Sequence, residues 1–323
     1  MKAVVIGENG LEMRDVAKPE PKSAEVLTKI SACGLNRADA LMAAGAFHGA
    51  RGSAGAVIGM EWSGDVVAVG NDVKNFSPGD RVMCAGSGGY AEYAVSDYGR
   101  TMKIPGTDMT YEQAATFPIA LQTMHNAIVT QGRLKEGESV LIQGASSGVG
   151  LMAMQIARHM GASQVFGTST NASRRARLTE FGADATFDSS DPAWVEGVLA
   201  ETGGEGVDLI IDQISGSVAN QNLEAAKVLG RIVNVGRLGG GIAEFNFDLH
   251  ALRRIEYIGV TFRTRSVDEI RSLVAAVERD LGSAIADGTL SLPIDETFPL
   301  VEAPAALDYM VANRHFGKIL LQP

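Results

Sequence analysis

A glycine-rich turn in the middle of the chain has the residue types and spacing most clearly suited to chemistry. It reads Gly144-Ala-Ser-Ser-Gly-Val-Gly150, follows a strand-forming run at 140–143, and leads into an apolar stretch. Glycine permits a tight turn and a close approach of backbone to ligand, and a helix N-terminus offers free N–H groups and a partial positive charge. The pattern is typical of a site for the pyrophosphate of a dinucleotide.

The position of this turn argues against one large class of dinucleotide enzymes. In short-chain dehydrogenases the turn opens an N-terminal domain and is served by a Tyr-x-x-x-Lys pair. Here the turn begins near residue 140 of 323, and none of the 6 tyrosines has a lysine four residues further on. The short-chain interpretation is therefore rejected.

The residues after the next expected strand indicate which dinucleotide binds. NAD sites usually place an acidic residue there for the ribose 2′-hydroxyl, and that residue would repel a 2′-phosphate. This chain instead has Thr168 and Ser169, followed by Arg174 and Arg175. Hydroxyl and guanidinium groups suit a phosphate, although an arginine can also simply cap a solvated helix. We predict NADPH.

Composition limits the remaining function classes. The formal net charge of −10 argues against nucleic acid or an anionic membrane as the main partner. Cys33 and Cys84 are too few for a disulfide framework or a four-thiolate zinc site, and the histidines lack metal-binding spacing. The start does not resemble a signal peptide and no apolar run reaches membrane length, so we expect a cytoplasmic protein with a small-molecule substrate.

The spacing of apolar residues along the chain predicts an α/β protein of two domains. Up to about residue 110 the chain alternates short strands and turns, with one helix expected at 37–44. From Thr110, which with Gln113 fits a capping box, strands and helices alternate as in a doubly wound parallel sheet. The segment from Leu292 onward again has the pattern of short strands and turns, so we infer that it completes the N-terminal domain. We therefore expect one domain of 1–113 plus 289–323 and another of 114–288. Expected strands are 2–6, 26–32, 64–69, 81–85, 90–95, 139–143, 164–167, 185–187, 207–212, 231–235, 256–260 and 318–321, and expected helices are 149–160, 173–181, 194–202, 218–228, 267–287 and 303–313.

Several motifs occur in order along the chain: Ala32-Cys-Gly-Leu-Asn-Arg-Ala-Asp39, Gly59-Met-Glu-Trp-Ser-Gly64, Phe76-Ser-Pro-Gly-Asp-Arg-Val82, the glycine turn, Val233-Asn-Val-Gly236 and Phe316-Gly-Lys-Ile-Leu320. Together they resemble the zinc-independent quinone oxidoreductase (zeta-crystallin-like) branch of the medium-chain dehydrogenase/reductase superfamily. The resemblance covers nearly the whole chain. It implies a Rossmann cofactor domain joined to a β-rich, GroES-like catalytic domain.

The resemblance also implies that no zinc is bound. The ligand positions of the zinc alcohol dehydrogenases read Asn36, Met60 and Ile119 here, and the structural-zinc lobe expected after Val82 is missing. Without a Lewis acid, an alcohol cannot be readily activated for oxidation. We therefore expect hydride transfer from NADPH to a quinone or a related conjugated carbonyl, with water supplying the proton.

The same resemblance assigns roles to individual residues. It implies that the cofactor lies between the domains, with Asn36 beside the nicotinamide and its amide toward the substrate carbonyl, and with Thr123 against the nicotinamide. The alternative for Asn36 is a turn residue bonded to its own backbone. Cofactor contacts are expected from Gly144, Ala145, Ser146, Ser147, Gly148, Val149, Gly150, Thr168, Ser169, Arg174, Val235, Gly236 and Lys318.

Two other functions remain open. One is an enoyl or alkenal reductase, for which Arg263 and Arg265 could hold an acyl carrier, although a solvated strand edge explains them equally simply. The other is a non-enzymatic NADPH-binding protein, as zeta-crystallin-type recruitment illustrates. Leu41 and Phe47 occupy positions where the branch often has tyrosines, which predicts an apolar substrate pocket, and His48 is either at its mouth or solvated.

Further charged residues have simple structural interpretations. Arg37 and Asp39 are expected to cap a helix and form a surface ion pair. Glu61 is expected to be a buried structural carboxylate held by an arginine such as Arg81. The apolar strand at 254–260 could form an exposed sheet edge, which predicts a homodimer.

Overall fold

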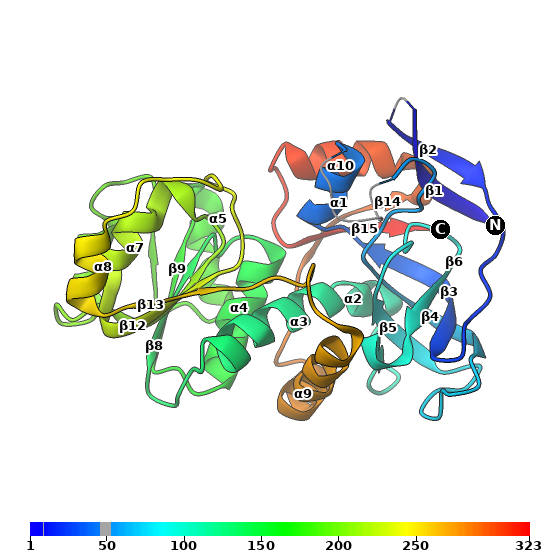
Figure 1. Cartoon of the computed structure of the whole chain (residues 1–323), viewed down its shortest axis with the longest axis horizontal. Helices are drawn as coiled ribbons and strands as arrows, with labels where there is room; N and C mark the ends of the chain where they lie inside the picture. The colour runs from blue at the N-terminus through cyan, green and yellow to red at the C-terminus, as the bar shows by residue number, and fades with distance from the viewer. Residues whose placement is uncertain (9, 46–52) are drawn as a thin grey trace. The chain divides into compact units, whose positions relative to one another are not determined.

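The computed structural model describes residues 1–8, 10–45 and 53–323 (Figure 1). The chain forms two compact units, one made of Met1–Ile119 with Arg263–Pro323 and the other of Ala120–Phe262. Phe47 and His48 lie outside the described residues. None of the helices in the described part of the chain is both long and apolar enough to cross a membrane.

The first unit contains a 7-stranded sheet and a separate hairpin. The C-terminal strand lies inside this sheet, parallel to β14 and antiparallel to β3, so the end of the chain pairs with strands near both termini. A core that includes Ile30, Trp62, Val82 and Ile319 packs against it. The sheet has the order β14 (Ile294–Pro299), β15 (Lys318–Gln322), β3 (Glu25–Gly34), β4 (Glu61–Val69), β5 (Arg81–Ala85) and β7 (Thr101–Lys103), with β6 (Tyr93–Asp97) also paired to β3, while β1 (Lys2–Gly7) and β2 (Gly10–Asp15) form the hairpin.

The helices of the first unit include one long helix that comes late in the sequence. The long helix α9 begins with a capping box formed by Ser266 and Glu269. The guanidinium of Arg271 donates to both carboxylate oxygens of Asp97 at 2.9 and 2.7 Å, and it lies 4.5 Å from the centre of the Tyr98 ring. These contacts connect α9 to the first unit, whereas the sequence pattern placed its residues in the domain 114–288. The helices are α1 (Arg37–Ala43), η1 (Tyr98–Arg100), α2 (Tyr111–Ala115), α9 (Val267–Ala286), η5 (Leu300–Glu302) and α10 (Ala303–Val311), and α3 (Pro118–His125) crosses into the second unit.

The second unit is the predicted doubly wound domain, and its 6 strands all run parallel. The sheet order reverses at β8, which has β9 on one side and β11 on the other. In open α/β sheets, ligands bind beyond the carboxyl ends of the strands at such a reversal. The strands in sheet order are β10 (Ala185–Phe187), β9 (Gln164–Thr168), β8 (Ser139–Gln143), β11 (Val207–Asp212), β12 (Ala226–Asn234) and β13 (Glu256–Gly259).

Helices connect these strands, and the one between β8 and β9 begins at the glycine-rich turn. In Figure 1 the helices α7 and α8 lie near β12, consistent with their packing. The helical segments are η2 (Asn126–Gln131, a π-helix), α4 (Gly148–His159), α5 (Ala172–Ala176), η3 (Leu178–Phe181), α6 (Trp194–Glu201), η4 (Gly216–Val218), α7 (Ala219–Ala225) and α8 (Phe247–Arg253).

Some elements differ from those predicted. The helix expected at 218–228 ends at Ala225, because Ala226 already pairs with Val207 as the start of β12. Leu229 has φ +67° and is 60% exposed, so its apolar side chain does not continue a helix face. The helix expected at 173–181 divides into α5 and η3, and β6 begins at Tyr93 rather than Tyr90. The short strands β2 and β7 and the helix α8 were not predicted.

Candidate functional site

The glycine-rich turn follows β8 and needs glycine at two positions. Gly144 has φ +71°, a left-handed conformation that residues with a Cβ rarely adopt. A Cβ on Gly150 would lie 2.6 Å from the carbonyl oxygens of both Gly144 and Ala145. Ser147 caps α4, because its Oγ accepts a hydrogen bond from the Gly150 N–H at 3.1 Å. The turn therefore places the amino end of α4 beside the carboxyl end of β8.

Thr168, a predicted cofactor contact, supports this turn from the end of β9. Its Oγ accepts from the Gly144 N–H at 3.1 Å and donates to the side-chain oxygen of Gln143 at 2.7 Å, and its carbonyl accepts from the Ala145 N–H at 2.9 Å. The side chain is fully buried. Because its single hydroxyl proton is already used, Thr168 holds the turn and has no donor left for a phosphate.

A buried polar network continues from Gln143 to the segment 235–236. Gln143 donates to Asn222 at 2.7 Å, and Asn222 donates to the Asp212 carboxylate at 3.0 Å. Burial raises the pKa of Asp212, whose carbonyl accepts from the N–H groups of Val235 and Gly236 at 2.7 and 3.1 Å. The network thus links the two predicted cofactor segments. Polar residues at the ends of the buried strands β8 and β11 were the sequence signal that could have revealed it.

The residues predicted for the 2′-phosphate, Thr168, Ser169, Arg174 and Arg175, lie at the end of β9 and in α5, and Ser169 reaches the glycine turn. The hydroxyl oxygens of Ser146 and Ser169 are 3.0 Å apart. Arg175 donates to the Ser169 carbonyl at 2.7 Å and pairs with Asp188 at 3.0 Å. Arg174 is half-buried near the start of α5. The two serines therefore lie side by side, and Arg175 holds the backbone at Ser169.

Asn36, the predicted catalytic residue, is held by groups from two other segments of the first unit. Its Nδ2 donates to Oε1 of Glu61 at 2.8 Å, and its Oδ1 accepts from Nζ of Lys318 at 3.2 Å. Lys318 also forms an ion pair with Glu61 and donates to the Leu35 carbonyl at 2.8 Å. Asn36 itself is the residue before α1, and its two partners, Glu61 and Lys318, are the first residues of β4 and β15.

These contacts change the interpretation of two charged residues. Glu61 is buried as expected, but its partner is Lys318 and not Arg81, whose guanidinium donates to carbonyls that include that of Met109. Lys318 was predicted to bind the cofactor, yet it is buried and all three of its ammonium protons have acceptors within the first unit. The ammonium group of Lys318 is therefore fully engaged by Asn36, Glu61 and the Leu35 carbonyl.

Asp39 is buried, which corrects the expected surface ion pair. Its Oδ2 accepts from the Asn36 N–H and from the Tyr90 hydroxyl, both at 2.9 Å. It does cap α1, as predicted, but away from solvent. Burial, assisted by the charge of nearby Glu61, raises the pKa of Asp39 to about 7, although the hydrogen bonds from Asn36 and Tyr90 and the charge of Lys318 oppose the increase. The thiol of Cys33 donates to the Gly89 carbonyl at 2.8 Å, and burial raises the pKa of this core thiol.

Comparison with known proteins gives the family. Residues 148–279 match the zinc-binding dehydrogenase family, and residues 22–106 match the alcohol dehydrogenase GroES-like domain. Quinone oxidoreductase of Rattus norvegicus is 30% identical over 95% of this chain and 92% of its own length. The chain belongs to the medium-chain dehydrogenase/reductase superfamily. This confirms the predicted resemblance, and the two units have the GroES-like and Rossmann folds of this superfamily.

Other relatives extend the range of activities in this superfamily. A mycobacterial quinone oxidoreductase has a TM-score of 0.89 at 26% identity and covers 100% of both chains. The CurK enoyl reductase has a TM-score of 0.87 at 26% identity and covers 99% of this chain and 98% of its own. A highly reducing polyketide synthase of Alternaria alternata is 30% identical over 96% of this chain, which spans only 12% of that protein.

The donor groups of this medium-chain dehydrogenase/reductase do not fit a zinc ion. Among the residues that the structure describes, no group of three His, Cys, Asp or Glu side chains is arranged to hold a metal. Asn36 bonds to Glu61 and Lys318, so an ammonium lies among these groups. A positive charge at that point opposes a metal cation, and amide, thioether and alkyl groups are poor zinc ligands.

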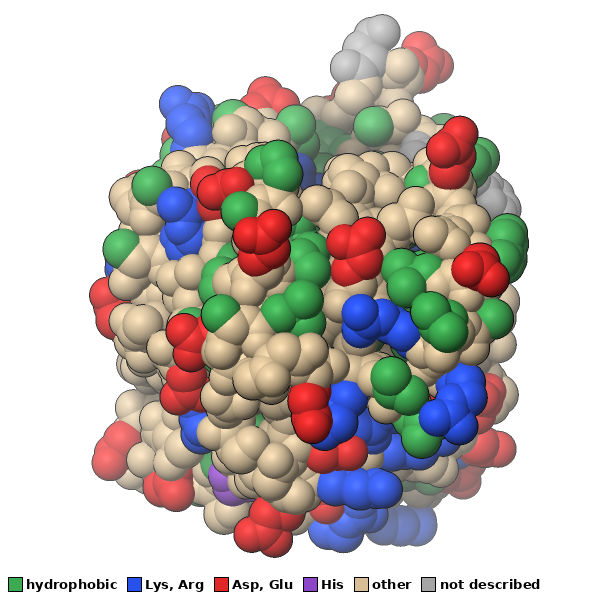
Figure 2. Space-filling view, turned by 90° about the vertical axis from the view of Figure 1, so that its left-hand side faces the viewer, with side chains coloured by type: hydrophobic (Ala, Val, Ile, Leu, Met, Phe, Trp, Pro, Cys, Tyr) green, Lys and Arg blue, Asp and Glu red, His purple; other side chains and the backbone are tan. Residues whose placement is uncertain are grey.

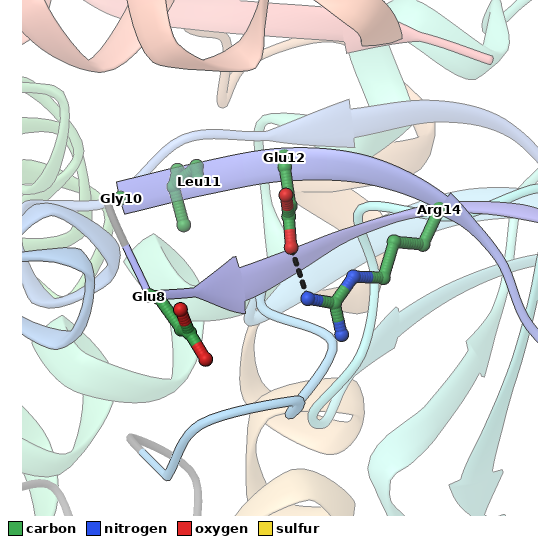
Figure 3. Close-up of a pocket in the computed structure, with 5 residues that line it drawn as sticks. All are labelled: Glu8, Gly10, Leu11, Glu12 and Arg14. Carbon is green, nitrogen blue, oxygen red and sulfur yellow. Dashed lines mark ion pairs between the residues drawn. The ribbon is translucent and has the colours of Figure 1, made fainter.

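Each of the two units has a surface hollow in its described part. Figure 3 shows a pocket of about 210 Å³ at the β1–β2 hairpin, where Glu12 pairs with Arg14 and neither belongs to the predicted site. A hollow of about 400 Å³ in the second unit is lined by residues that include Asn234, Arg237 and Tyr257. Neither hollow is lined by any of the predicted site residues.

We expect Gly150→Ala to weaken binding of a nicotinamide dinucleotide by at least about tenfold, because the added Cβ would displace the carbonyls of the turn. Fluorescence titration of the cofactor measures this change. Gly282→Ala on α9 is the matched control, since nothing lies within 4 Å of its added Cβ. Unchanged affinity in folded Gly150→Ala would contradict a role of the turn in binding.

Asp39 should make stability depend on pH. Its folded-state pKa of about 7 exceeds the ordinary value of 3.8, so the folded protein retains this proton more tightly than the unfolded chain. Its contribution to the free energy of unfolding is therefore largest below pH 4 and declines until the pH passes 7. Relative to wild type, Asp39→Asn should gain stability as the pH rises from about 5 to 8. Chemical denaturation at both pH values tests this, with the exposed Asp248→Asn as control, and a constant difference would refute it.

Proposed function

We propose that this protein is an NADPH-dependent reductase that transfers hydride to quinones or related conjugated carbonyls without zinc. The observation that carries the proposal is the group of contacts around Asn36. An amide N–H that can donate to a carbonyl oxygen stands at a position where zinc relatives have a ligand, and a lysine ammonium lies next to it. The whole-length similarity to quinone oxidoreductases supports the same reaction class.

NADPH, when bound, supplies the hydride. The glycine turn and the amino end of α4 are suited to its pyrophosphate, because backbone N–H groups and the helix dipole favour an anion. We assign Ser146, Ser169 and Arg174 to the 2′-phosphate, and the backbone at 235–236 to the carboxamide. A mycobacterial relative with a TM-score of 0.89 was solved in complex with NADPH, which supports this choice of cofactor.

Asn36 acts on the substrate. As hydride arrives, negative charge develops on the carbonyl oxygen, and an N–H donor fixed in advance stabilises that charge more than it stabilises the neutral substrate. Thr123, which is partly exposed on α3, positions the nicotinamide. Water supplies the proton. Because conjugation already spreads the developing charge, the reaction needs no metal.

An enoyl or alkenal reductase is the second candidate. It is favoured by the similarity to the CurK enoyl reductase and to the polyketide synthases. Both candidates use hydride transfer to a conjugated system, so the difference lies in the acceptor. A non-enzymatic NADPH-binding protein is the third, and tight NADPH binding without turnover would distinguish it.

We also propose a homodimer. The strand β13 pairs with β12 on one side and ends the sheet on the other. Figure 2 shows hydrophobic side chains interspersed with charged ones on the face that it presents, and the exposed residues Ile242, Phe247 and Leu252 belong to the second unit. An open strand edge with exposed apolar neighbours is a surface that proteins usually cover by pairing.

Asn36→Ala should lower kcat for NADPH oxidation by a small quinone by about a hundredfold, the usual effect of removing one donor to a developing oxyanion, with NADPH affinity unchanged. The assay uses a panel of quinones, enones and enals, with Asn75→Ala in an exposed turn as control. The activity should persist with a chelator. Unchanged turnover in Asn36→Ala would remove this residue from the mechanism, and faster reduction of enals than quinones would favour the second candidate.

Arg174→Ala should raise the KM for NADPH at least about tenfold and leave the KM for NADH nearly unchanged, because only NADPH loses a charge-assisted hydrogen bond. Arg177→Ala is the matched control, since Arg177 pairs with Glu180 on the surface. Steady-state kinetics with both cofactors measure the effect. Equal changes for NADH and NADPH would exclude Arg174 from 2′-phosphate recognition.

A further inference from the structure

The orientation of the Asn36 amide is determined by its two charged neighbours. The oxygen and nitrogen ends of a carboxamide have nearly the same shape, so hydrogen-bond partners decide which end lies where. A carboxylate only accepts and an ammonium only donates. Nδ2 therefore faces Glu61 at 2.8 Å and Oδ1 faces Lys318 at 3.2 Å. The reversed amide would place oxygen against carboxylate and N–H against ammonium, which are two repulsive contacts.

The two charged groups are themselves fixed. Oε2 of Glu61 accepts from the Ile119 N–H at 2.8 Å, while Oε1 binds both Asn36 and Lys318. The side chains of Lys318 and Glu61 are 5% and 0% exposed, so water does not compete for them. The neighbouring Gly34 leaves room for the carboxylate, since a Cβ there would lie 2.6 Å from Oε1.

This orientation determines what Asn36 can offer a ligand. Its Oδ1 is occupied by the ammonium and one of its two Nδ2 protons by Glu61, which leaves the second proton as a donor. The adjacent ammonium draws electron density through Oδ1 and strengthens this N–H, whereas the Glu61 carboxylate on the other Nδ2 proton acts in the opposite direction. Asn36 therefore matches a ligand atom that accepts a hydrogen bond, such as a carbonyl oxygen.

We propose that Glu61 and Lys318 are positioning residues that hold Asn36 as a hydrogen-bond donor toward the substrate carbonyl. The identity of that substrate rests on the proposed function, whereas the orientation of the amide does not. Neither residue contacts the substrate. Their effect on catalysis passes through Asn36 alone.

The informative variant is the double substitution Glu61→Gln/Lys318→Met. A single substitution leaves a buried charge without its partner and can prevent folding, whereas the double variant removes both charges at similar volume. The introduced glutamine can accept from the Ile119 N–H through its oxygen and donate to Asn36 through its nitrogen, so the Asn36 amide is free to reverse. The matched control is Glu205→Gln/Lys227→Met, the same change at a 2.6 Å ion pair on the surface.

The orientation is measured by NMR on protein labelled with ¹⁵N at asparagine, with the Asn36 signal assigned by its loss in Asn36→Ala. One amide proton should be shifted downfield and exchange slowly in the wild type and in the control. In the double variant both properties should disappear. An unchanged Asn36 signal there would overturn the proposed orientation.

The consequence for catalysis is measured with the quinone and enone panel. The double variant should lose about ten- to a hundredfold in kcat, as expected for a displaced group, with NADPH affinity kept. A changed NMR signal with unchanged kcat would overturn the positioning role. If the wild type reduces no member of the panel, the proposed function fails, and the NMR comparison alone supports or overturns the orientation of the amide.

Discussion

A lysine and a glutamate buried together impose the strongest constraint on the first unit. Removing two charges from water is costly, and their mutual attraction compensates only if the remaining hydrogen-bonding groups also find partners. Lys318 and Glu61 meet this condition with Asn36, the Leu35 carbonyl and the Ile119 N–H. The C-terminal strand must therefore lie beside β3 for the pair to form, which is where the sheet places it. The interaction that completes the sheet also fixes the candidate catalytic amide.

The second unit connects its site by hydrogen bonds among buried polar side chains. Gln143, Asn222 and Asp212 link the ends of β8 and β11, and Asp212 in turn holds the N–H groups of 235–236. A change at any of these buried residues would leave polar groups unsatisfied, at a cost of about 1–3 kcal/mol each. The glycine turn is thus one end of a rigid network, which keeps its backbone ready for an anion. Preformed donors of this kind need no rearrangement when a ligand binds.

The fold was largely predictable because its signals are local. The period of apolar residues, the glycine turn and the capping box at Thr110 and Gln113 each depend on neighbours in sequence, and the structure contains all three. The errors arise where contacts between residues distant in sequence determine the local structure. Pairing with β11 ends α7 at Ala225, and Lys318 reaches Glu61 across 257 positions where the sequence pattern favoured Arg81. No local pattern distinguishes one buried cation from another, and none indicates that Asp39 is buried.

In the proposed reductase an amide with an ammonium beside it stands where zinc relatives have a ligand, and this has a chemical consequence for the substrate. A zinc ion polarises a carbonyl strongly enough to act on simple alcohols and aldehydes. One N–H donor, even when strengthened by a neighbouring ammonium, stabilises developing negative charge less than a divalent cation does. The acceptor must therefore supply the remaining stabilisation by delocalising charge through its own conjugated system. On this argument, the pair that orients Asn36 also restricts the proposed enzyme to quinones, enones and similar acceptors.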